Sequence, residues 1–384
     1  MSENLKLIEE VKNKIKNADN KNFNLRFNRY VYWTDKDKAV KIDAKKANNF
    51  KSKSLKKRKT DLSAIAFYYS RMFSDSIRIF DAETQWRLIV GLGSSHPAET
   101  SMTLDHIYGI PYIPGSAIKG VLNHYWIKEK MYETANKLFG SEELMEIENA
   151  LQKNRENLLK ENKKPLFYGV YSFIEQLSVK MSFVSKNGKV IETLQNRDEI
   201  RKSFSEKCRL KEQMMPLLEK LLDSEDFQKD VKIYQELFGT QERIGKIIFF
   251  DAFPVNDKFS FVDDVMTPHF GDYYGKTAPP ADYLNPNPIK FLTVKGTFRF
   301  IFIHRPLNGN IKSDLLKEVS DSFTKALEIY GIGAKTAVGY GRFENFKDVT
   351  DDVIRTKENE FRMKQEKRKK EEKEKLKEAE KEKI

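Results

Sequence analysis

Apolar positions in the second quarter of the chain recur with the spacing of a strand and then of a helix. Residues 85–90 predict a strand, and residues 117–139 predict a helix that Gly140 closes. Further along, residues 245–253 are almost wholly apolar, which indicates a strand in the middle of a sheet. These segments follow one another in the order strand, helix, strand.

A similar pattern returns near the C-terminal end. Residues 294–303 alternate between apolar and polar side chains, with three phenylalanines on one face of the predicted strand. A helix is predicted over residues 313–330 and a short strand over residues 338–344. The complete order is β-α-β-β-α-β. We therefore expect an α+β fold with an elaborated ferredoxin-like core, the plan that RNA-recognition modules use.

Two insertions interrupt this core, which we place at residues 85–345. Residues 141–237 are highly charged and mostly helix-forming, so we expect a helical lobe there. Residues 254–293 lack periodicity and are rich in Pro, Asp, Asn and Tyr. Long irregular loops inside a compact domain are usually functional, so this second insertion is a candidate functional segment.

The two ends of the chain add an extension and a tail. Residues 1–84 form the extension, in which we expect a short helix over residues 1–20, a strand over 25–33 and a helix over 61–80, folded onto the core. The tail, residues 346–384, ends in a run of Lys and Glu. That run predicts either a single exposed helix or a disordered segment, and neither alternative implies chemistry.

Positive charge predominates, with a formal net charge of +12 at neutral pH. This balance predicts a polyanionic partner. Residues 36–59 carry eleven Lys or Arg against two Asp and few apolar residues, so we expect a mobile basic arm. Such an arm can close on a phosphate backbone.

Cysteine content and hydropathy restrict the class of protein. The single cysteine, Cys208, excludes an internal disulfide framework and a Cys-rich zinc site. The first residues contain no apolar signal segment, and no apolar run has the length needed to cross a bilayer. We expect a soluble protein of the reducing cytoplasm, with no membrane partner, cofactor or metal.

Glycine, hydroxyl and basic side chains are concentrated between Gly91 and Asn123, where the first predicted strand leads into the first helix. Here Gly115 permits a close approach, Ser116 can cap the first helical turn, and Lys119 lies one turn later beside it. A helix N-terminus presents free N–H groups to a phosphate. The alternative is an ordinary capped helix with a solvated lysine.

A second glycine-rich segment, residues 331–341, connects the last helix to the last strand. Its glycines can expose successive backbone N–H groups to an anion, and Lys335, Tyr340 and Arg342 add charge and an aromatic ring. It is not a P-loop, because Ala334 precedes the lysine and the order is helix, loop, strand. The alternative is a glycine-rich turn needed for close packing.

Several short segments together resemble the RAMP superfamily of CRISPR proteins, and within it the subunits of type III-B effector complexes. The resemblance covers residues 85–345 and is carried by IPGSAIKG (113–120), FFDAFP (249–254), TPHFGDYY (267–274), NPNP (285–288) and GIGAKTAVGYGRFE (331–344). It implies an RRM-like subunit near the end of a helical ribonucleoprotein. Its partners would be the CRISPR guide RNA, the target RNA and other RAMP-type subunits. Residues 254–293 would correspond to a thumb-like hairpin that reaches toward a neighbouring subunit and the guide–target duplex.

The resemblance also implies how RNA is held. Such subunits bind the guide RNA by its phosphate backbone, while base pairing reads the sequence. The predicted RNA-contacting residues are Ser95, His96, Thr103, Gly115, Ser116, Lys119, Gly331, Gly333, Lys335, Thr336, Gly339, Tyr340, Gly341 and Arg342. The predicted role is a non-catalytic scaffold that holds guide RNA and ends the subunit filament in antiviral defence.

An endoribonuclease is the alternative, because other RAMP proteins cut precursor guide RNA with one histidine. His96, in a Gly/Ser loop after a predicted strand, is the candidate base. However, no second base or orienting acid accompanies it in the sequence, and no carboxylate spacing supports a metal site. Asp251, inside an apolar strand, is either catalytic or, as we prefer, a structural acceptor for loop N–H groups. We therefore predict no catalytic residue.

Overall fold

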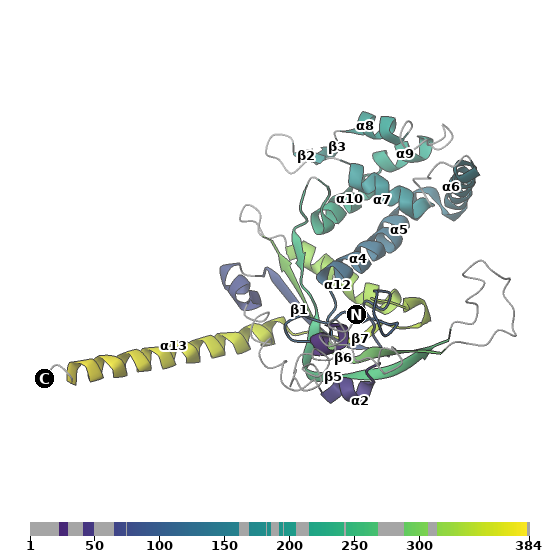
Figure 1. The fold of residues 1–384 in the computed structure, drawn as a ribbon. Coiled ribbons are helices and arrows are strands. Elements are labelled where there is room, and N and C mark those ends of the chain that lie inside the picture. The colour runs from purple at the N-terminus through teal and green to yellow at the C-terminus, as the bar shows by residue number, and fades with distance from the viewer. Residues whose placement is uncertain are drawn as a thin grey trace, which may run out of the picture. The chain divides into compact units, whose positions relative to one another are not determined.

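The computed structural model contains a five-stranded β-sheet. Among the described residues its strands are β1 (Ile77–Thr84), β4 (Ile247–Phe249), β5 (Phe253–Met266), β6 (Ile289–His304) and β7 (Phe343–Asp348). Their order is β4-β6-β1-β7, and β5 also pairs with β6. Figure 1 labels β1, β5, β6 and β7. The pairs β1–β6, β1–β7 and β5–β6 are antiparallel.

The structure describes residues 23–29, 41–49, 65–73, 75–160, 169–181, 183–185, 192–194, 196–204, 215–241, 243–267, 288–305 and 313–381. The chain divides into two compact units. We call residues 1–118, 249–303 and 327–384 the core unit, and residues 119–248 and 304–326 the helical unit.

Both helices predicted for the core pattern are present. The first comprises α4 (Gly115–Tyr125), a π-helical turn η2 (Trp126–Met131) and α5 (Tyr132–Phe139). It ends at Gly140, whose φ of 80° no other residue type adopts easily, as predicted. The second is α12 (Ser313–Ile329). Helices thus accompany an antiparallel sheet, which confirms the α+β class.

The alternation predicted for residues 294–303 is also confirmed, because the three phenylalanines of β6 are buried on one face. Phe298 and Phe300 contact the ring of Phe343 on β7 edge to face, with centroids 6.0 and 5.4 Å away. Phe300 also lies opposite Phe80 of β1 in the antiparallel register, and Phe302 is fully buried. Edge-to-face rings of this kind stabilise a packed face beyond their buried area.

The strand predicted over residues 85–90 is wrong. β1 ends at Thr84, and the following segment joins β6 through a backbone bridge between Leu88 and Val294. The helix predicted over residues 61–80 is also wrong in part, since a helix at 65–72 is followed by β1 from Ile77. Apolar periodicity indicates burial but not strand pairing. Here buried apolar residues after Thr84 lie in a loop rather than in a sheet ladder.

Two further strand predictions were misplaced. Within residues 245–253 the strand is β4, Ile247–Phe249, which stands at one end of the strand order rather than in its middle. Within residues 338–344, a 3₁₀ turn η5 (Thr336–Val338) comes first and β7 begins at Phe343. An apolar run shows that residues are covered, but not which strands lie beside them.

The strand predicted over residues 25–33 is wrong where the structure describes it. Leu25–Arg29 form a π-helical turn, η1. Phe23 and Phe27, four residues apart, are both buried with ring centroids 5.5 Å apart, so the apolar spacing is helical. Residues 30–33, like the helix predicted over residues 1–20, lie outside the described part.

The basic arm predicted over residues 36–59 is partly ordered. Residues Ala44–Asn49 form a short helix, α2, with Ala44 and Ala47 buried. The Ala44 N–H donates to Asp263 of β5 at 2.9 Å. This described part is therefore folded against the sheet rather than mobile, and the rest of the arm lies outside the described residues.

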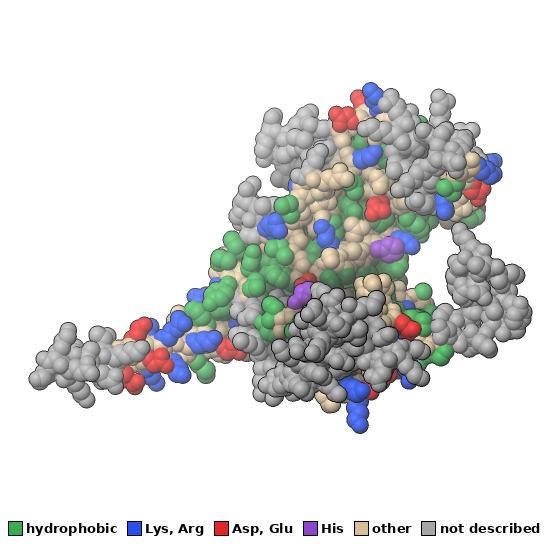
Figure 2. All heavy atoms as spheres, in the orientation of Figure 1, with side chains coloured by type: hydrophobic (Ala, Val, Ile, Leu, Met, Phe, Trp, Pro, Cys, Tyr) green, Lys and Arg blue, Asp and Glu red, His purple; other side chains and the backbone are tan. Residues whose placement is uncertain are grey.

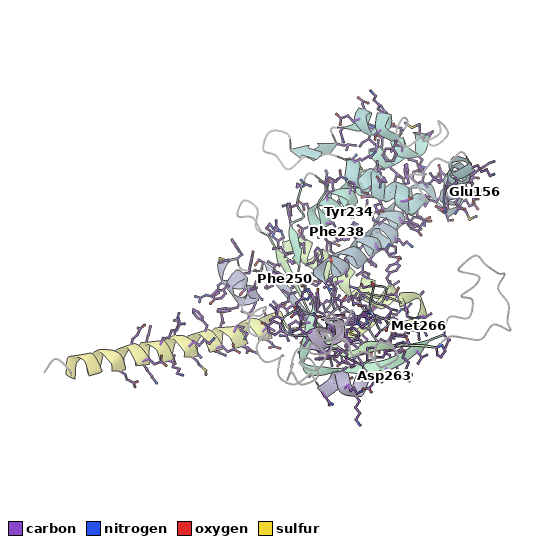
Figure 3. The ribbon with its side chains drawn as sticks, in the orientation of Figure 1. Glu156, Tyr234, Phe238, Phe250, Asp263 and Met266 are labelled. Carbon is purple, nitrogen blue, oxygen red and sulfur yellow. The ribbon has the colours of Figure 1, made fainter. Side chains whose placement is uncertain are left out.

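The insertion predicted to be irregular, residues 254–293, is a long hairpin where it is described. β5 and β6 pair from Phe253 opposite Arg299 to Met266 opposite Ile289, with a register shift on the way. Figure 3 labels Asp263 and Met266 on this hairpin. Polar residues on β5 hid its alternation, and residues 268–287 lie outside the described part.

The Lys/Glu-rich tail is a helix, α13 (Thr350–Lys381), which decides between the two predicted alternatives over those residues. Val353 is buried near its start, and Phe361 packs on Phe67 of the helix at 65–72 with centroids 5.7 Å apart. Beyond that contact, Lys/Arg and Asp/Glu side chains are mixed along the exposed helix (Figure 2). Intrahelical ion pairs such as Lys367–Glu371 support it.

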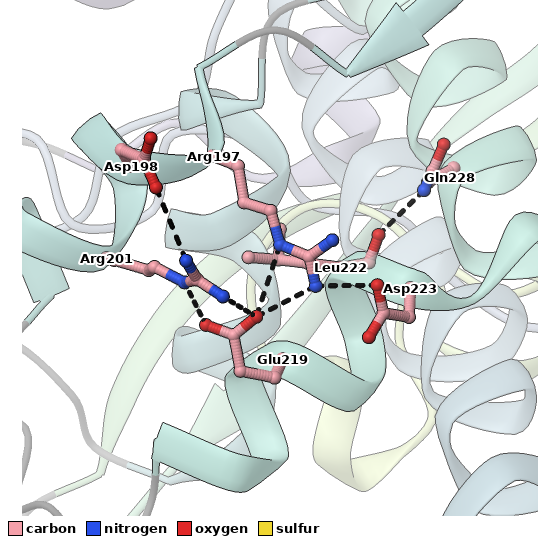
Figure 4. A network of polar contacts seen from close by, with 7 residues as sticks. All are labelled: Arg197, Asp198, Arg201, Glu219, Leu222, Asp223 and Gln228. Atoms are coloured by element: carbon pink, nitrogen blue, oxygen red, sulfur yellow. Dashed lines mark hydrogen bonds and ion pairs between the residues drawn. The ribbon is translucent and has the colours of Figure 1, made fainter.

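The insertion at residues 141–237 is helical, as predicted. Its elements are α6 (Ser141–Lys160), α7 (Val170–Lys180), the β2–β3 hairpin (Phe183–Ser185, Glu192–Leu194), α8 (Arg197–Lys202), α9 (Met215–Asp223) and α10 (Glu225–Phe238). Buried residues on α10 include Tyr234 and Phe238 (Figure 3). Arg197 and Arg201 of α8 both bind Glu219 of α9, joining these short helices (Figure 4).

Candidate nucleic-acid interface

The chain after β1 lies against the glycine-rich segment 331–341. The Gln85 N–H donates to the Arg342 carbonyl at 2.9 Å, and the Gly341 N–H donates to the Arg87 carbonyl at 2.7 Å. One step further, the Ala334 N–H donates to the Ile89 carbonyl at 2.8 Å. These bonds hold the glycine loop, our name for residues 331–342, at the end of the sheet.

Two glycines of this loop are required by packing. Gly333 has a φ of 97°, and a Cβ there would clash with the Ile89 carbonyl oxygen. Gly341 has a φ of 70°, and a Cβ there would clash with the Ile332 carbonyl oxygen. Gly339, at a φ of 95°, has open space beside it instead. The close-packing alternative thus accounts for the first two positions.

At least six of the loop's twelve N–H groups are already engaged, which corrects the expectation of successive free donors. Within the protein, hydrogen bonds are donated by the N–H groups of Ile332, Ala334, Val338, Gly339, Tyr340 and Gly341. A donor satisfied in this way is not available to a phosphate. The N–H groups at these positions, including those of the predicted contacts Gly339 and Gly341, are therefore not free to bind a phosphate. What the loop contributes there is a fixed backbone conformation.

Side chains of the loop differ in accessibility. Lys335, Thr336 and Arg342 are half-buried, and Gly333 is exposed, so these reach the surface. Lys335 adopts a left-handed φ of 61°, and its Nζ lies 5.7 Å from the ring centroid of Phe291. The cationic side chains are therefore the members that could meet an anion.

Tyr340, predicted as an RNA contact, is 4% exposed and belongs to the core. Its ring packs with Ile89 and Phe291, and its hydroxyl donates to Asp264 of β5. Asp264 also binds Arg87 at 2.6 Å. Because this ring has no exposed face, it cannot stack on a base, and we correct its role to support of the loop.

Asp264 and Tyr340 shift each other's pKa. Burial, followed by the hydrogen bond to the Asp264 carboxylate, raises the pKa of Tyr340 to about 12. Desolvation tends to raise the pKa of Asp264, but it is outweighed by the bonds from Tyr340, the Val265 N–H and Arg87. The pKa of Asp264 therefore lies below its ordinary value. The carboxylate stays charged and the phenol stays protonated near neutral pH.

His96 is held by the N-terminal extension. The Ala98 N–H donates to Nδ1 at 3.0 Å, so Nδ1 is an acceptor and Nε2 carries the proton. Nε2 then donates to the Phe27 carbonyl at 2.8 Å, and the Phe27 ring stacks on the imidazole at 4.7 Å. Both ring nitrogens are thus engaged in structural bonds.

The other predicted contacts in this stretch are more open. Ser95 is exposed, and Thr103 is half-buried with its N–H donating to the Val90 carbonyl at 2.8 Å. Nearby, Lys41 binds Glu99 and so ties residues beside α2 to the same loop. Ser95 is the member of this group with the most accessible side chain.

The start of α4 is capped by a carboxylate. Asp251 accepts a hydrogen bond from the Gly115 N–H at 2.7 Å. This bond fits the structural role that we preferred for Asp251 over a catalytic one. Gly115 is buried, and a Cβ there would clash with the Phe249 carbonyl oxygen. Ser116 is inside the first turn rather than a cap, and it is exposed. Asp251 therefore takes a position where a phosphate was expected.

The two predicted phosphate sites have different neighbours. The start of α4 is tied to Asp251 and Phe249, whereas the glycine loop is tied to Arg87 and Ile89. Half-buried Lys119 belongs to the helical unit, although Gly115 and Ser116 belong to the core unit. Convergence of both sites on one ligand stays a prediction.

Comparison with known families identifies the chain. The model of the RAMP superfamily matches residues 81–344, more than half of the sequence. The chain belongs to the RAMP superfamily. The glycine loop and the start of α4 both lie within the matched residues.

Relatives of this RAMP protein include two CRISPR subunits. The CRISPR system Cmr subunit Cmr6 of Pyrococcus furiosus is 30% identical over 274 residues, 69% of this chain and 66% of that protein. The CRISPR system CMR subunit Cmr6 of Saccharolobus solfataricus is 36% identical over 113 residues, 29% of this chain and 36% of that protein. The chain thus spans less than two thirds of either relative's length.

A solved structure is also similar. The crystal structure of Cmr6 from Pyrococcus furiosus aligns with a TM-score of 0.32 and 29% identity, over 70% of this chain and 96% of that chain.

In the part of the RAMP protein that the structure describes, no group of three His, Cys, Asp or Glu side chains could hold a metal ion. No helix among those residues is long and apolar enough to span a membrane.

Three residues of the RAMP region were missed by the sequence interpretation. Arg87 and Asp264 anchor Tyr340, and Trp86, which is 44% exposed, packs its ring against Tyr340 with centroids 4.6 Å apart. A tryptophan five residues before the glycine-rich stretch that begins at Gly91 was a signal available in the sequence, although its exposure was not. The pairing of Asp264 with Arg87 was not, because 176 residues separate Arg87 from this part of β5.

Proposed function

We propose that this chain is a non-catalytic, RNA-binding subunit of a type III-B CRISPR effector complex. In this proposal it holds guide RNA by its phosphates and ends the filament of RAMP-type subunits. The observation that carries the proposal is the glycine loop. It is a rigid, backbone-tied loop in the RAMP-matched region, with Lys335, Thr336 and Arg342 reaching the surface. The relatives named Cmr6 subunits of CRISPR systems support the assignment.

The strand order supports a ferredoxin-like core. We number β1, β4, β6 and β7 as strands one to four in chain order. Read across the sheet from β7, they lie in the order 4-1-3-2. A helix follows the first strand and another follows the third, as that plan requires. Because β1 begins at Ile77 and β7 ends at Asp348, we assign this core to residues 77–348 rather than the expected 85–345, with residues 1–76 as an extension and 349–384 as a tail.

RNA contact falls on the loop rather than on the sheet face. RRM-type sheets stack bases on aromatic residues of the central strands. Here the face opposite the phenylalanines carries Arg299, which binds Asp81 through two hydrogen bonds of 2.7 Å. At that position a charge pair stands where an RRM carries an aromatic ring. A loop that meets phosphates is compatible with recognition of the backbone alone.

The hairpin of β5 and β6 is our candidate for the thumb-like segment. It would reach toward a neighbouring subunit and the guide–target duplex, so its partners would be target RNA and other RAMP-type subunits. Its described residues extend as a paired ladder from Phe253 to Met266 on β5. A rigid two-stranded arm can place its far end away from the rest of a sheet.

The geometry of His96 counts against the endoribonuclease alternative. A general base must present a free ring nitrogen to the ribose hydroxyl. In His96, one nitrogen accepts from Ala98 and the other donates to Phe27. Freeing either nitrogen costs about 1–3 kcal/mol for the partner left unsatisfied.

The proposal is tested with purified protein and labelled single-stranded repeat RNA. Binding should weaken with salt, and Lys335→Glu with Arg342→Glu should reduce the magnitude of the log–log salt slope by roughly 0.7 for each phosphate that the loop no longer neutralises. Lys364→Glu with Lys369→Glu, at two exposed positions on α13, is the charge-matched control and should bind as wild type does. Affinity that is independent of both salt and the loop substitutions would refute RNA binding at the loop.

A cleavage assay tests the non-catalytic role. The same RNA is incubated with the protein without metal, and we expect no product. Ordered cleavage that His96→Ala abolishes would establish the endoribonuclease instead.

A further inference from the structure

We propose that Trp86 is a stacking platform for one nucleobase of single-stranded RNA, beside the phosphate contacts of the glycine loop. This inference rests on the proposed RNA-binding function and adds a base contact to it. The indole is 44% exposed, although its neighbours in the chain are tied down. An aromatic residue with this much of its surface open to solvent can accept a base on its ring.

The indole ring is contacted by two side chains, Tyr340 and Arg87. Tyr340 packs against it with centroids 4.6 Å apart and planes inclined by 49°. The guanidinium of Arg87 lies 5.0 Å from the indole centroid. Both supports are themselves fixed by the carboxylate of Asp264, which binds Arg87 at 2.6 Å and accepts from the Tyr340 hydroxyl. Trp86 thus rests on a connected polar and aromatic network.

The backbone on either side of the indole is fixed as well. The residue before it, Gln85, donates to Arg342, and the residue after it, Arg87, accepts from Gly341. A ring that is already ordered loses little side-chain entropy when a ligand covers it. This preorganisation distinguishes Trp86 from a surface aromatic that happens to be exposed.

The surroundings favour a nucleotide over an apolar partner. Backbone bonds tie Trp86's neighbours to the loop that carries Lys335, Thr336 and Arg342. A π-face beside cationic side chains matches a base with its phosphate, because stacking and charge are the two terms of single-strand binding. Every base offers a π-face, so the expected ligand is single-stranded RNA with little sequence preference.

Another exposed aromatic provides a contrast. Tyr68 is 53% exposed on the helix at 65–72, where Ile65 and Met72 are also exposed and the exposed Arg71 lies over the rings of Phe67 and Phe361. The Tyr68 ring packs on Phe361 of α13 rather than on a glycine loop. Tyr68 is therefore the matched control: an exposed aromatic in the same unit without the cationic loop beside it.

The test compares Trp86→Ala, Trp86→Phe and Tyr68→Ala in the full-length chain, with circular dichroism to confirm folding. For single-stranded RNA, Trp86→Ala should lower affinity by roughly 5- to 100-fold, and Trp86→Phe should lower it much less. Tyr68→Ala should bind as wild type does. The salt slope should be unchanged in Trp86→Ala, because the cationic side chains that meet phosphates are still present, whereas Lys335→Glu should change it.

A second measurement reports stacking directly. Bases quench indole emission, so RNA should quench fluorescence that is present in wild type and absent from Trp86→Phe. RNAs that carry one abasic nucleotide, each at a different position, are also compared. At one of these positions, loss of the base should weaken binding to wild type but not to Trp86→Ala. Such non-additivity would assign the base to Trp86.

The outcomes separate this inference from the function on which it rests. If wild type shows no salt-dependent RNA binding, the proposed function and the platform are both overturned. If wild type binds, Lys335→Glu weakens binding and Trp86→Ala does not, the platform alone is overturned and the exposed ring is assigned to a protein contact. The platform is supported if Trp86→Ala lowers affinity, if RNA quenches the Trp86 emission of wild type, and if Trp86→Ala is insensitive to the abasic nucleotide.

Discussion

The side-chain amide of Asn48 pairs with both backbone groups of Phe261. Its Nδ2 donates to the Phe261 carbonyl at 3.0 Å, and its Oδ1 accepts from the Phe261 N–H at 2.9 Å. The amide thus takes the place of a neighbouring strand along β5. Unpaired strand edges invite pairing with other chains, so the basic arm, through α2, covers this edge with one side chain.

Replacing Asn48 by Asp should destabilise the protein. A carboxylate cannot donate to the Phe261 carbonyl, so one hydrogen bond disappears and two oxygens face each other. We expect a decrease of about 1–3 kcal/mol in the free energy of unfolding, measured by urea denaturation. Asn49→Asp, at the exposed next position, is the matched control. Equal stability of the two variants would show that the edge contact does not contribute.

Gly341→Ala should be strongly destabilising. A Cβ at a φ of 70° would strain the backbone and would also clash with the Ile332 carbonyl oxygen. We expect a cost of more than about 2 kcal/mol, seen as a lower midpoint of thermal unfolding. Gly120→Ala, in α4 with open space beside it, should instead stabilise by about 0.5–1 kcal/mol. The opposite signs of the two changes are the check.

Stability at alkaline pH should depend on Tyr340. The folded-state pKa of this residue, about 12, lies above its ordinary value of 10.0. A raised pKa gives stability that is fully present below pH 10 and is lost as the pH rises toward 12. Tyr340→Phe should remove this part of the pH dependence, measured as the difference from wild type in urea unfolding from about pH 9 to about pH 12. A Tyr340→Phe variant that keeps the wild-type pH dependence would contradict this contribution.

Asp251→Ala should destabilise the start of α4. The Gly115 N–H would lose its acceptor, and the helix N-terminus would lose a favourable negative charge. We expect a cost of about 1–3 kcal/mol in the free energy of unfolding. Asp251→Asn keeps a side-chain oxygen at the same place and should recover part of that stability. A fully stable Asp251→Ala would contradict the structural role of this carboxylate.

Much of the secondary structure could be predicted, but strand positions could not. The helix that ends at Gly140 and the alternation of Phe298, Phe300 and Phe302 are strong local signals, and both are confirmed. β5 was missed because Asp263 and Asp264 look like loop residues. In the structure Asp263 accepts from Ala44 and Asp264 binds Arg87, so distant residues compensate these charges.

The sequence predicted where the candidate site lies in the chain, but not how its side chains are arranged. Glycine spacing indicated the loop at residues 331–341, and Lys335 and Arg342 do reach its surface. The inward position of Tyr340 was not visible, because its partner Asp264 lies 76 residues earlier. The sequence interpretation also missed Trp86, whose exposure depends on how the segment after β1 packs on the loop.

The amino-acid sequence by itself determined the α+β class, the two helices of the core pattern, the phenylalanine face of β6, the basic charge and the glycines at the turns. These are local properties, since helix or strand spacing and backbone freedom depend on neighbouring residues. Tertiary structure alone decided that Asp251 caps α4, that His96 is held by Phe27 and that Tyr340 is buried on Asp264. Those contacts depend on the register and packing of distant segments, which no local pattern encodes.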